Sequence, residues 1–197
     1  YYQKAFGAFA SVVNMSVFPG NVFWVDSGQT DTGADTAGFG VHPDAPFLTI
    51  DFAVGQCTAN QGDVIFVMPG HAETVSAAAG LDLDVAGITV IGIGDGAATP
   101  TITLDTANTA DIDVDAANIT VENIHFIAGF ADIAAAIDVN ADDFTLRRCR
   151  FSESATDLNA LIWVQDAAAG GSDRITIEDC QAIGLLDAAN THFVNFA

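Results

Sequence analysis

Short segments of alternating apolar and polar residues recur along the chain from residue 81 onward. Each repeat holds one such segment, a short turn, and a second segment that contains a threonine. The first segments begin at residues 81, 112, 137 and 162, and the second begin at residues 88, 119, 144 and 175. A period of two is typical of β-strands, because successive side chains point to opposite faces. The pattern therefore predicts a repeat of two or more short strands.

These repeats are too small to form a core alone. A unit with short strands and no helical pattern must stack on its neighbours to bury its apolar face. This favours a parallel β-solenoid, in which each coil adds one strand to each of several sheets. A β-sandwich also has short alternating strands, but it does not require one threonine at the same place in each repeat. The threonine column comprises Thr89, Thr120, Thr145 and Thr176.

Stacking places aligned residues about 4.8 Å apart, so each aligned position predicts a column of neighbours. Two inward columns hold Ile, Val, Leu and Phe, and a third contains Ile93, Ile124, Cys149 and Cys180. Buried cysteine behaves as a small hydrophobic residue, so we expect Cys149 and Cys180 to be free, unreactive thiols. With Cys57 they make an odd number and form no CxxC pair, which argues against a disulfide framework and a zinc site.

The chain has only five basic residues, and three of them lie between residues 147 and 150. The columns place Arg147 between two glutamates and Arg148 beside an aspartate. Opposite charges on neighbouring strands attract by about 0.2–1 kcal/mol per pair. We therefore predict a structural charge ladder in preference to an anion-binding or catalytic cluster. Its members are Glu122, Arg147, Glu178, Arg148 and Asp179.

A second outward column carries like charges. It contains Asp82, Asp113 and Asp138, and the alignment ends it with Trp163, which we regard as a candidate for stacking on a sugar ring. Acidic pairs resembling a glycosidase pair or a calcium site occur throughout a chain with this many aspartates. We therefore assign no catalytic, cofactor-binding or metal-binding residue. Ca²⁺ is the cofactor that such carboxylates would suit, and we assign it to no particular residues.

The first part of the chain differs from the repeats. Residues 1–20 are apolar and aromatic and predict an N-terminal arm or docking segment, while residues 21–197 predict the β-helix domain. Within that domain we expect a strand over Val22–Val25, a short amphipathic helix over Leu48–Cys57 and a strand over Val64–Met68. The C-terminal end reads as another strand, so we expect it to be incomplete or capped by a partner.

Charge and motifs narrow the function classes. The formal net charge of −21 disfavours nucleic acid and anionic lipid as partners. No apolar run is long enough to span a bilayer. The four histidines show no metal-binding spacing, and no nucleophile elbow is present. His71 follows Pro69-Gly70 and is expected to be a loop residue rather than a base.

The entry into the repeats resembles a known family. The segments NVFWVDSG (21–28) and PFLTIDFAVGQCTANQGDVIFVMPGHAET (46–74) are similar to the start of pectate-lyase-like right-handed parallel β-helix proteins. They look most like the β-helix tail, fibre and head-surface proteins encoded by viruses, over residues 20–182. The resemblance implies a right-handed parallel β-helix with a short N-terminal capping helix.

Lyases of this family use a calcium-binding aspartate cluster and a nearby arginine base. No motif of this chain matches them residue by residue, and Arg147, Arg148 and Arg150 are the only candidates.

These observations favour a non-enzymatic structural or binding module of a virion surface, as a fibre, tail or capsid decoration, with glycan contact. We expect a virion or extracellular location, a homo-oligomer or other virion proteins as partners, and polysaccharide as a ligand. The alternatives are a polysaccharide lyase or glycoside hydrolase, and a cell-surface or filament subunit. Fold alone does not decide among them.

Overall fold

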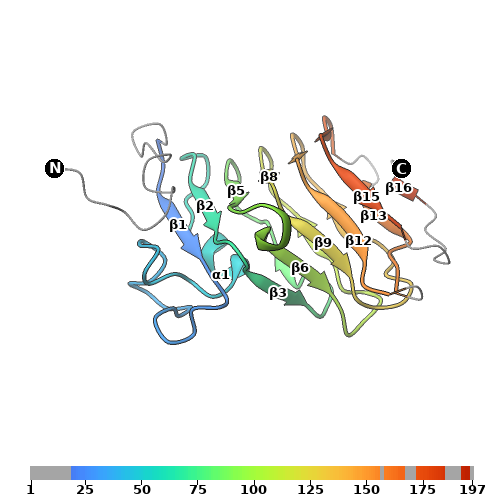
Figure 1. The fold of residues 1–197 in the computed structure, drawn as a ribbon. Helices are drawn as coiled ribbons and strands as arrows, with labels where there is room; N and C mark the ends of the chain where they lie inside the picture. Colours follow the sequence, from blue (N-terminus) through green and yellow to red (C-terminus); the bar gives the residue numbers. More distant parts are fainter. Residues whose placement is uncertain (1–18, 156–157, 167–171, 185–191, 196–197) are drawn as a thin grey trace.

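The chain folds as a parallel β-solenoid, as the repeat pattern predicts (Figure 1). The computed structural model describes residues 19–155, 158–166, 172–184 and 192–195. The N-terminal arm expected over residues 1–20 therefore lies, except for Pro19 and Gly20, outside the described residues. Much of the segment expected to need a cap at the C-terminal end lies outside them too.

Three parallel sheets run the length of the solenoid. The first sheet comprises β1 (Val22–Val25), β2 (Val64–Val67), β5 (Thr89–Gly92), β8 (Thr120–Glu122), β11 (Thr145–Arg147) and β14 (Thr176–Glu178). The second comprises β4 (Leu81–Asp82), β7 (Ile112–Val114), β10 (Ile137–Val139), β13 (Ile162–Asp166) and β16 (His192–Asn195). The third comprises β3 (Ala72–Val75), β6 (Thr101–Leu104), β9 (His125–Ala128), β12 (Arg150–Glu153) and β15 (Gln181–Ile183).

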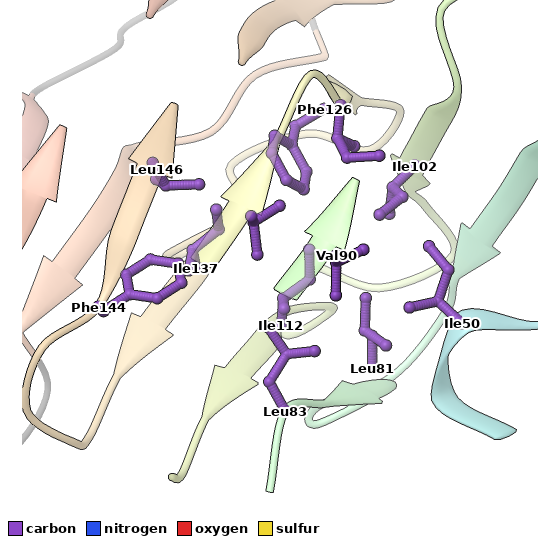
Figure 2. Close-up of a pocket in the computed structure, with 12 residues that line it drawn as sticks. Ile50, Leu81, Leu83, Val90, Ile102, Ile112, Phe126, Ile137, Phe144 and Leu146 are labelled. Atoms are coloured by element: carbon purple, nitrogen blue, oxygen red, sulfur yellow. The ribbon is translucent and has the colours of Figure 1, made fainter. Parts of the chain in front are cut away.

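The core lies between the three sheets and is made of the inward side chains of each strand. Figure 2 shows a gap in this core, lined by twelve apolar side chains that include Leu81, Val90 and Ile112. Aromatic rings fill the core further along, where Phe126 and Phe151 stack with centroids 5.1 Å apart. Apolar burial of this kind is the main stabilising term of the fold.

A short helix closes the core beside the first strands. Helix α1 spans Ile50–Val54, which is shorter than the expected Leu48–Cys57, and the Thr49 side chain caps it by accepting a hydrogen bond from the Phe52 amide. Its Ile50, Ala53 and Val54 are buried in the core. The helix contacts β1, β2 and β4.

Turns before and after the later strands of the first sheet repeat one backbone conformation. A positive φ occurs in each coil just before the strand, at Gly87, Asn118, Asp143 and Arg174, and again just after it, at Asn123, Arg148 and Asp179. Only glycine adopts this conformation without cost, and Asn and Asp tolerate it best among the others. Two arginines at such positions therefore need compensating contacts.

The register confirms the threonine column and the column of Asp82, Asp113 and Asp138. Two other assignments are wrong. Ile93 belongs to an outer cluster and not to the core column, because β5 continues straight as β2 does and Gly92 takes the inward place. Val164 rather than Ile162 lies opposite Ile137, so Gln165 and not Trp163 follows Asp138.

Candidate functional site

Charged side chains gather on the outer faces of two sheets. On the first sheet, Arg147 of β11 lies opposite Glu122 of β8 and Glu178 of β14. This follows from the alternation of the strands, since Leu146 points into the core and directs Arg147 outward. We call Glu122, Arg147, Arg148 and Glu178 the ionic ladder.

Glutamates on both sides hold the two arginines of the ionic ladder. The Arg147 Nε lies 3.1 Å from the Glu178 Oε2, and its Nη1 lies 3.8 Å from the Glu122 Oε2. Arg148 pairs with the other carboxylate oxygen of Glu122 rather than with Asp179, which lies in the same turn column. Each ion pair crosses between coils, so the ladder ties three successive coils together.

The preceding turn column carries a further arginine–carboxylate pair. Arg174 donates to both oxygens of Asp143, with distances of 2.5 and 2.8 Å. This hydrogen bonding lowers the pKa of the Asp143 carboxyl. Sequence reasoning did not single out this pair, although the two residues align at the position just before the strand.

The outer face of the second sheet carries a run of three carboxylates. Asp82, Asp113 and Asp138 lie directly opposite one another on β4, β7 and β10, and we call them the acidic column. Oxygens of Asp111, Asp113 and Asp138 lie within 4.8 Å of one another. The Oδ1 atoms of Asp82 and Asp138 are buried and have no hydrogen-bond partner among the described residues. Like charges placed directly opposite destabilise a sheet.

Burial, together with the neighbouring negative charges, raises the pKa values of the acidic column. Burial, followed by the charges of Asp111, Asp115, Asp138 and Asp82, raises the pKa of Asp113 to about 6. Burial and the charge of Asp111 raise the pKa of Asp138 to about 6, against a hydrogen bond with Gln165. The pKa of Asp82 is raised as well, by burial and by Asp84, Asp115 and Asp51. These carboxyls therefore bind protons more tightly in the folded protein than in the unfolded chain.

Two kinds of partner can neutralise the acidic column. A proton shared between neighbouring carboxyls removes one charge, as the raised pKa values favour. A hard cation such as Ca²⁺ prefers carboxylate oxygens, and Asp111, Asp113 and Asp138 are the residues that could hold it. Ca²⁺ takes about six to eight oxygen ligands, more than three monodentate carboxylates provide, so water or other groups would complete its shell.

Trp163 does not lie at the end of the acidic column. It is only 3% exposed, and its ring packs against Phe151 with centroids 5.3 Å apart. The shifted register of β13 gives its place in the column to Gln165. A large apolar ring gains more from burial than from exposure, and the core position leaves no ring face for a sugar.

The cysteines are free thiols. Cys149 is fully buried, and Cys180 lies beside it at the edge of the core. A hydrogen bond with Cys180 and then burial raise the pKa of the Cys149 thiol, and burial raises the pKa of Cys57 to about 12. A protonated thiol is a poor nucleophile and a poor metal ligand, which describes Cys57 and Cys149. The hydrogen bond with Cys149 lowers the pKa of the Cys180 thiol, so the expectation of an unreactive thiol is not supported at Cys180.

His71 is fully buried, which the sequence did not indicate. Its Nδ1 accepts a hydrogen bond from the Ser27 amide at 3.0 Å, so its Nε2 carries the proton and donates to Glu73 at 3.2 Å. Glu73 also accepts from the amide of Ile50, the first residue of α1. Both ring nitrogens are therefore used to join the loop after β1, β3 and α1, and neither is available as a base.

The third sheet places another arginine beside a histidine. Arg150 of β12 lies opposite His125 of β9, and the His125 Nε2 lies 2.8 Å from the Ser152 hydroxyl. Burial and the charge of Arg150 lower the pKa of His125. The Arg150 Nε is buried and has no hydrogen-bond partner among the described residues.

Comparison of the chain with protein family models, with curated proteins and with solved structures found no match. In the described part of the chain, no helix is long and apolar enough to cross a membrane. The parallel β-solenoid is consistent with a β-helix family.

The acidic column predicts that the protein loses stability as the pH rises. A carboxyl with a raised pKa contributes most below its unfolded pKa of about 4 and loses that contribution as the pH passes the folded pKa. Here the loss should fall between about pH 4 and the value of about 6 given by Asp113 and Asp138. We expect Asp113→Asn to raise Tm at pH 7.5 and to flatten the dependence of Tm on pH.

Thermal unfolding between pH 4 and pH 8 measures this effect. The control is Asp31→Asn, which removes the same charge from an exposed loop position. Equal gains in the two variants would show that net charge alone is responsible.

The ionic ladder predicts a cost for reversing its central charge. Arg147→Glu places three glutamates in succession, which replaces two attractions with two repulsions. We expect the free energy of unfolding to fall by about 1–2 kcal/mol, which lowers Tm by about 2–4 °C per kcal/mol. Because salt screens exposed charges, 1 M NaCl should make this loss smaller. Arg147→Met, which keeps the aliphatic stem, should cost less. An unchanged Tm in Arg147→Glu would contradict a stabilising role for the ladder.

Proposed function

We propose that this chain is a non-enzymatic structural module with a binding surface, and that it decorates the surface of a virion as a fibre, tail or capsid protein. The observation that supports this most is the ionic ladder with its companion pair. Arg147, Arg148 and Arg174 each contact a carboxylate of a neighbouring coil.

Such contacts favour a structural use of these arginines. The guanidinium group matches carboxylates in a two-pronged geometry, which serves an acidic ligand and a protein carboxylate equally well. In this chain the carboxylates come from the protein itself. A sugar acid would have to displace Glu122 or Asp143 to reach the same arginines.

The shape of the molecule supports a binding role for the outer faces. A solenoid repeats its surface from coil to coil, which produces extended faces suited to partners and to lateral assembly. The acidic column and the ionic ladder lie on two different sheets, so two faces with different charge are available. The virus setting rests on the resemblance of residues 21–28 and 46–74, and a filament subunit would share the same physical features.

One observation favours a second function, that of a polysaccharide lyase or glycoside hydrolase. Arg150, His125 and Ser152 lie together on the outer face of the third sheet. Unlike the other three described arginines, Arg150 forms no ion pair with the described residues. The Arg150 guanidinium could bind the carboxylate of an acidic sugar, and the neutral His125 beside it could accept a proton as the base.

Immunogold electron microscopy tests the virion setting directly. Antibodies raised against the purified chain should label the surface of native virus particles from the source culture. Label on host cell envelopes or filaments would support the filament subunit instead. Recovery of the chain only as a free monomer would contradict both assemblies.

A screen of acidic and neutral polysaccharides, with and without CaCl₂, separates the module from the enzyme. We expect no release of unsaturated products or reducing ends from any substrate. Turnover that is lost in Arg150→Ala and retained in Arg174→Ala would establish the enzyme and overturn our proposal. The Arg174→Ala variant removes a guanidinium of the same kind from a different sheet face.

A further inference from the structure

The first sheet has an apolar outer face over its first three strands. Its members pack together outside the core and form what we call the outer patch. They are Val22, Trp24, Val64, Phe66, Ile91 and Ile93. The rings of Trp24 and Phe66 lie with centroids 5.0 Å apart. The patch is distinct from the core cluster that the inward residues of the same strands form.

The same columns change character farther along the sheet. One column runs from Trp24 through Phe66 and Ile91 and then continues as Glu122 and Arg147. Solvent-facing positions of a sheet ordinarily carry polar residues, as β8 and β11 do here. The apolar half of this face therefore gains stability when another segment packs over it, whereas the charged half is stable in contact with water.

Burial agrees with a covered face. Val64 is 3%, Phe66 6% and Val22 8% exposed, although these side chains point away from the core. An apolar sheet face that lies outside the core is stabilised by a covering segment that removes it from water.

We propose that the outer patch is the docking site of the chain's own N-terminal segment, residues 1–18. Twelve of these eighteen residues are apolar or aromatic, and Lys4 is their only charged residue. Phe6, Phe9 and Val13 follow a roughly helical spacing. The segment therefore supplies apolar side chains of the kind that the outer patch accommodates.

The attachment point brings the segment to the patch. The Asn21 amide donates to the carboxylate of Asp63 at 2.6 Å, which joins the residue just before β1 to the residue just before β2. Three strands at about 4.8 Å spacing span only about 10 Å, whereas eighteen residues can extend several times farther. A covalent tether of this length holds the segment near the patch at high effective concentration, which favours it over a second copy.

Hydrogen exchange on the full chain tests the docking. We expect the amides of residues 5–18 to be protected in the wild type, and to exchange faster in Ile91→Lys, which places a charge in the outer patch. Thr145→Lys adds the same charge to an outward position of the same sheet beyond the patch, and it should leave the protection unchanged. Circular dichroism verifies that each variant is folded.

A change in the segment itself gives a second reading that is independent of the patch variants. Phe9→Ser should shift the emission of Trp24 to longer wavelength and steepen its quenching by acrylamide, whereas Gln3→Ser should not. Trp163 is buried in the core and contributes equally to all of these chains.

Two outcomes would overturn the proposal. In the first, residues 5–18 of the wild type exchange at the rate of an unstructured peptide. In the second, their protection depends on protein concentration and accompanies a dimeric mass, which would assign the patch to a second copy.

Discussion

In-register stacking of parallel strands is the constraint on which this structure depends. A residue of an inner strand has a counterpart about 4.8 Å away in the coil on either side, so the same kind of residue recurs at that position along the stack. For apolar residues this repetition is favourable, and it yields one continuous core from α1 to β13. For charged residues it is unfavourable unless the sign alternates or the charge is removed. The outer faces of the first and second sheets avoid this repulsion in two different ways.

The two responses differ in how they depend on the solvent. The first sheet alternates glutamate and arginine, and its ion pairs hold as long as both groups are charged. The second sheet repeats aspartate, and the raised pKa values of Asp113 and Asp138 reduce its negative charge because these carboxyls keep a proton to a higher pH. In a chain with a net charge of −21, only five basic residues are available for alternation. Arg147, Arg148 and Arg174, three of the four described arginines, are used where positive-φ turns or facing glutamates require them.

Periodicity was sufficient to predict the fold class and the columns of two sheets, because alternation and repeat length are written directly in the sequence. Three things were not predictable in this way. In the third sheet no single residue type recurs from coil to coil as threonine does in the first. The register of β13 places Val164 opposite Ile137 and the Trp163 ring against Phe151, and alternation along the strand fits either register. The buried His71 depends on contacts with Ser27, which lies 44 residues away.

Asn123 marks a change in the type of coil. Its side chain donates to the carbonyls of Gly92 and Gly94 at 2.8 and 3.0 Å, where the straight coil of β5 meets the first turn of the later kind. A side chain at Gly92 would collide with the Asn123 backbone, so this junction accepts only glycine. Beyond it, the coils that begin at β8, β11 and β14 share the same turns on both sides of the strand. The turns of the β8 and β11 coils therefore match, and a duplicated coil inserted between β8 and β11 would meet like turns on both sides at the first sheet. The length of the solenoid can therefore grow on one side of Asn123 while the other side, with α1 and the outer patch, stays fixed.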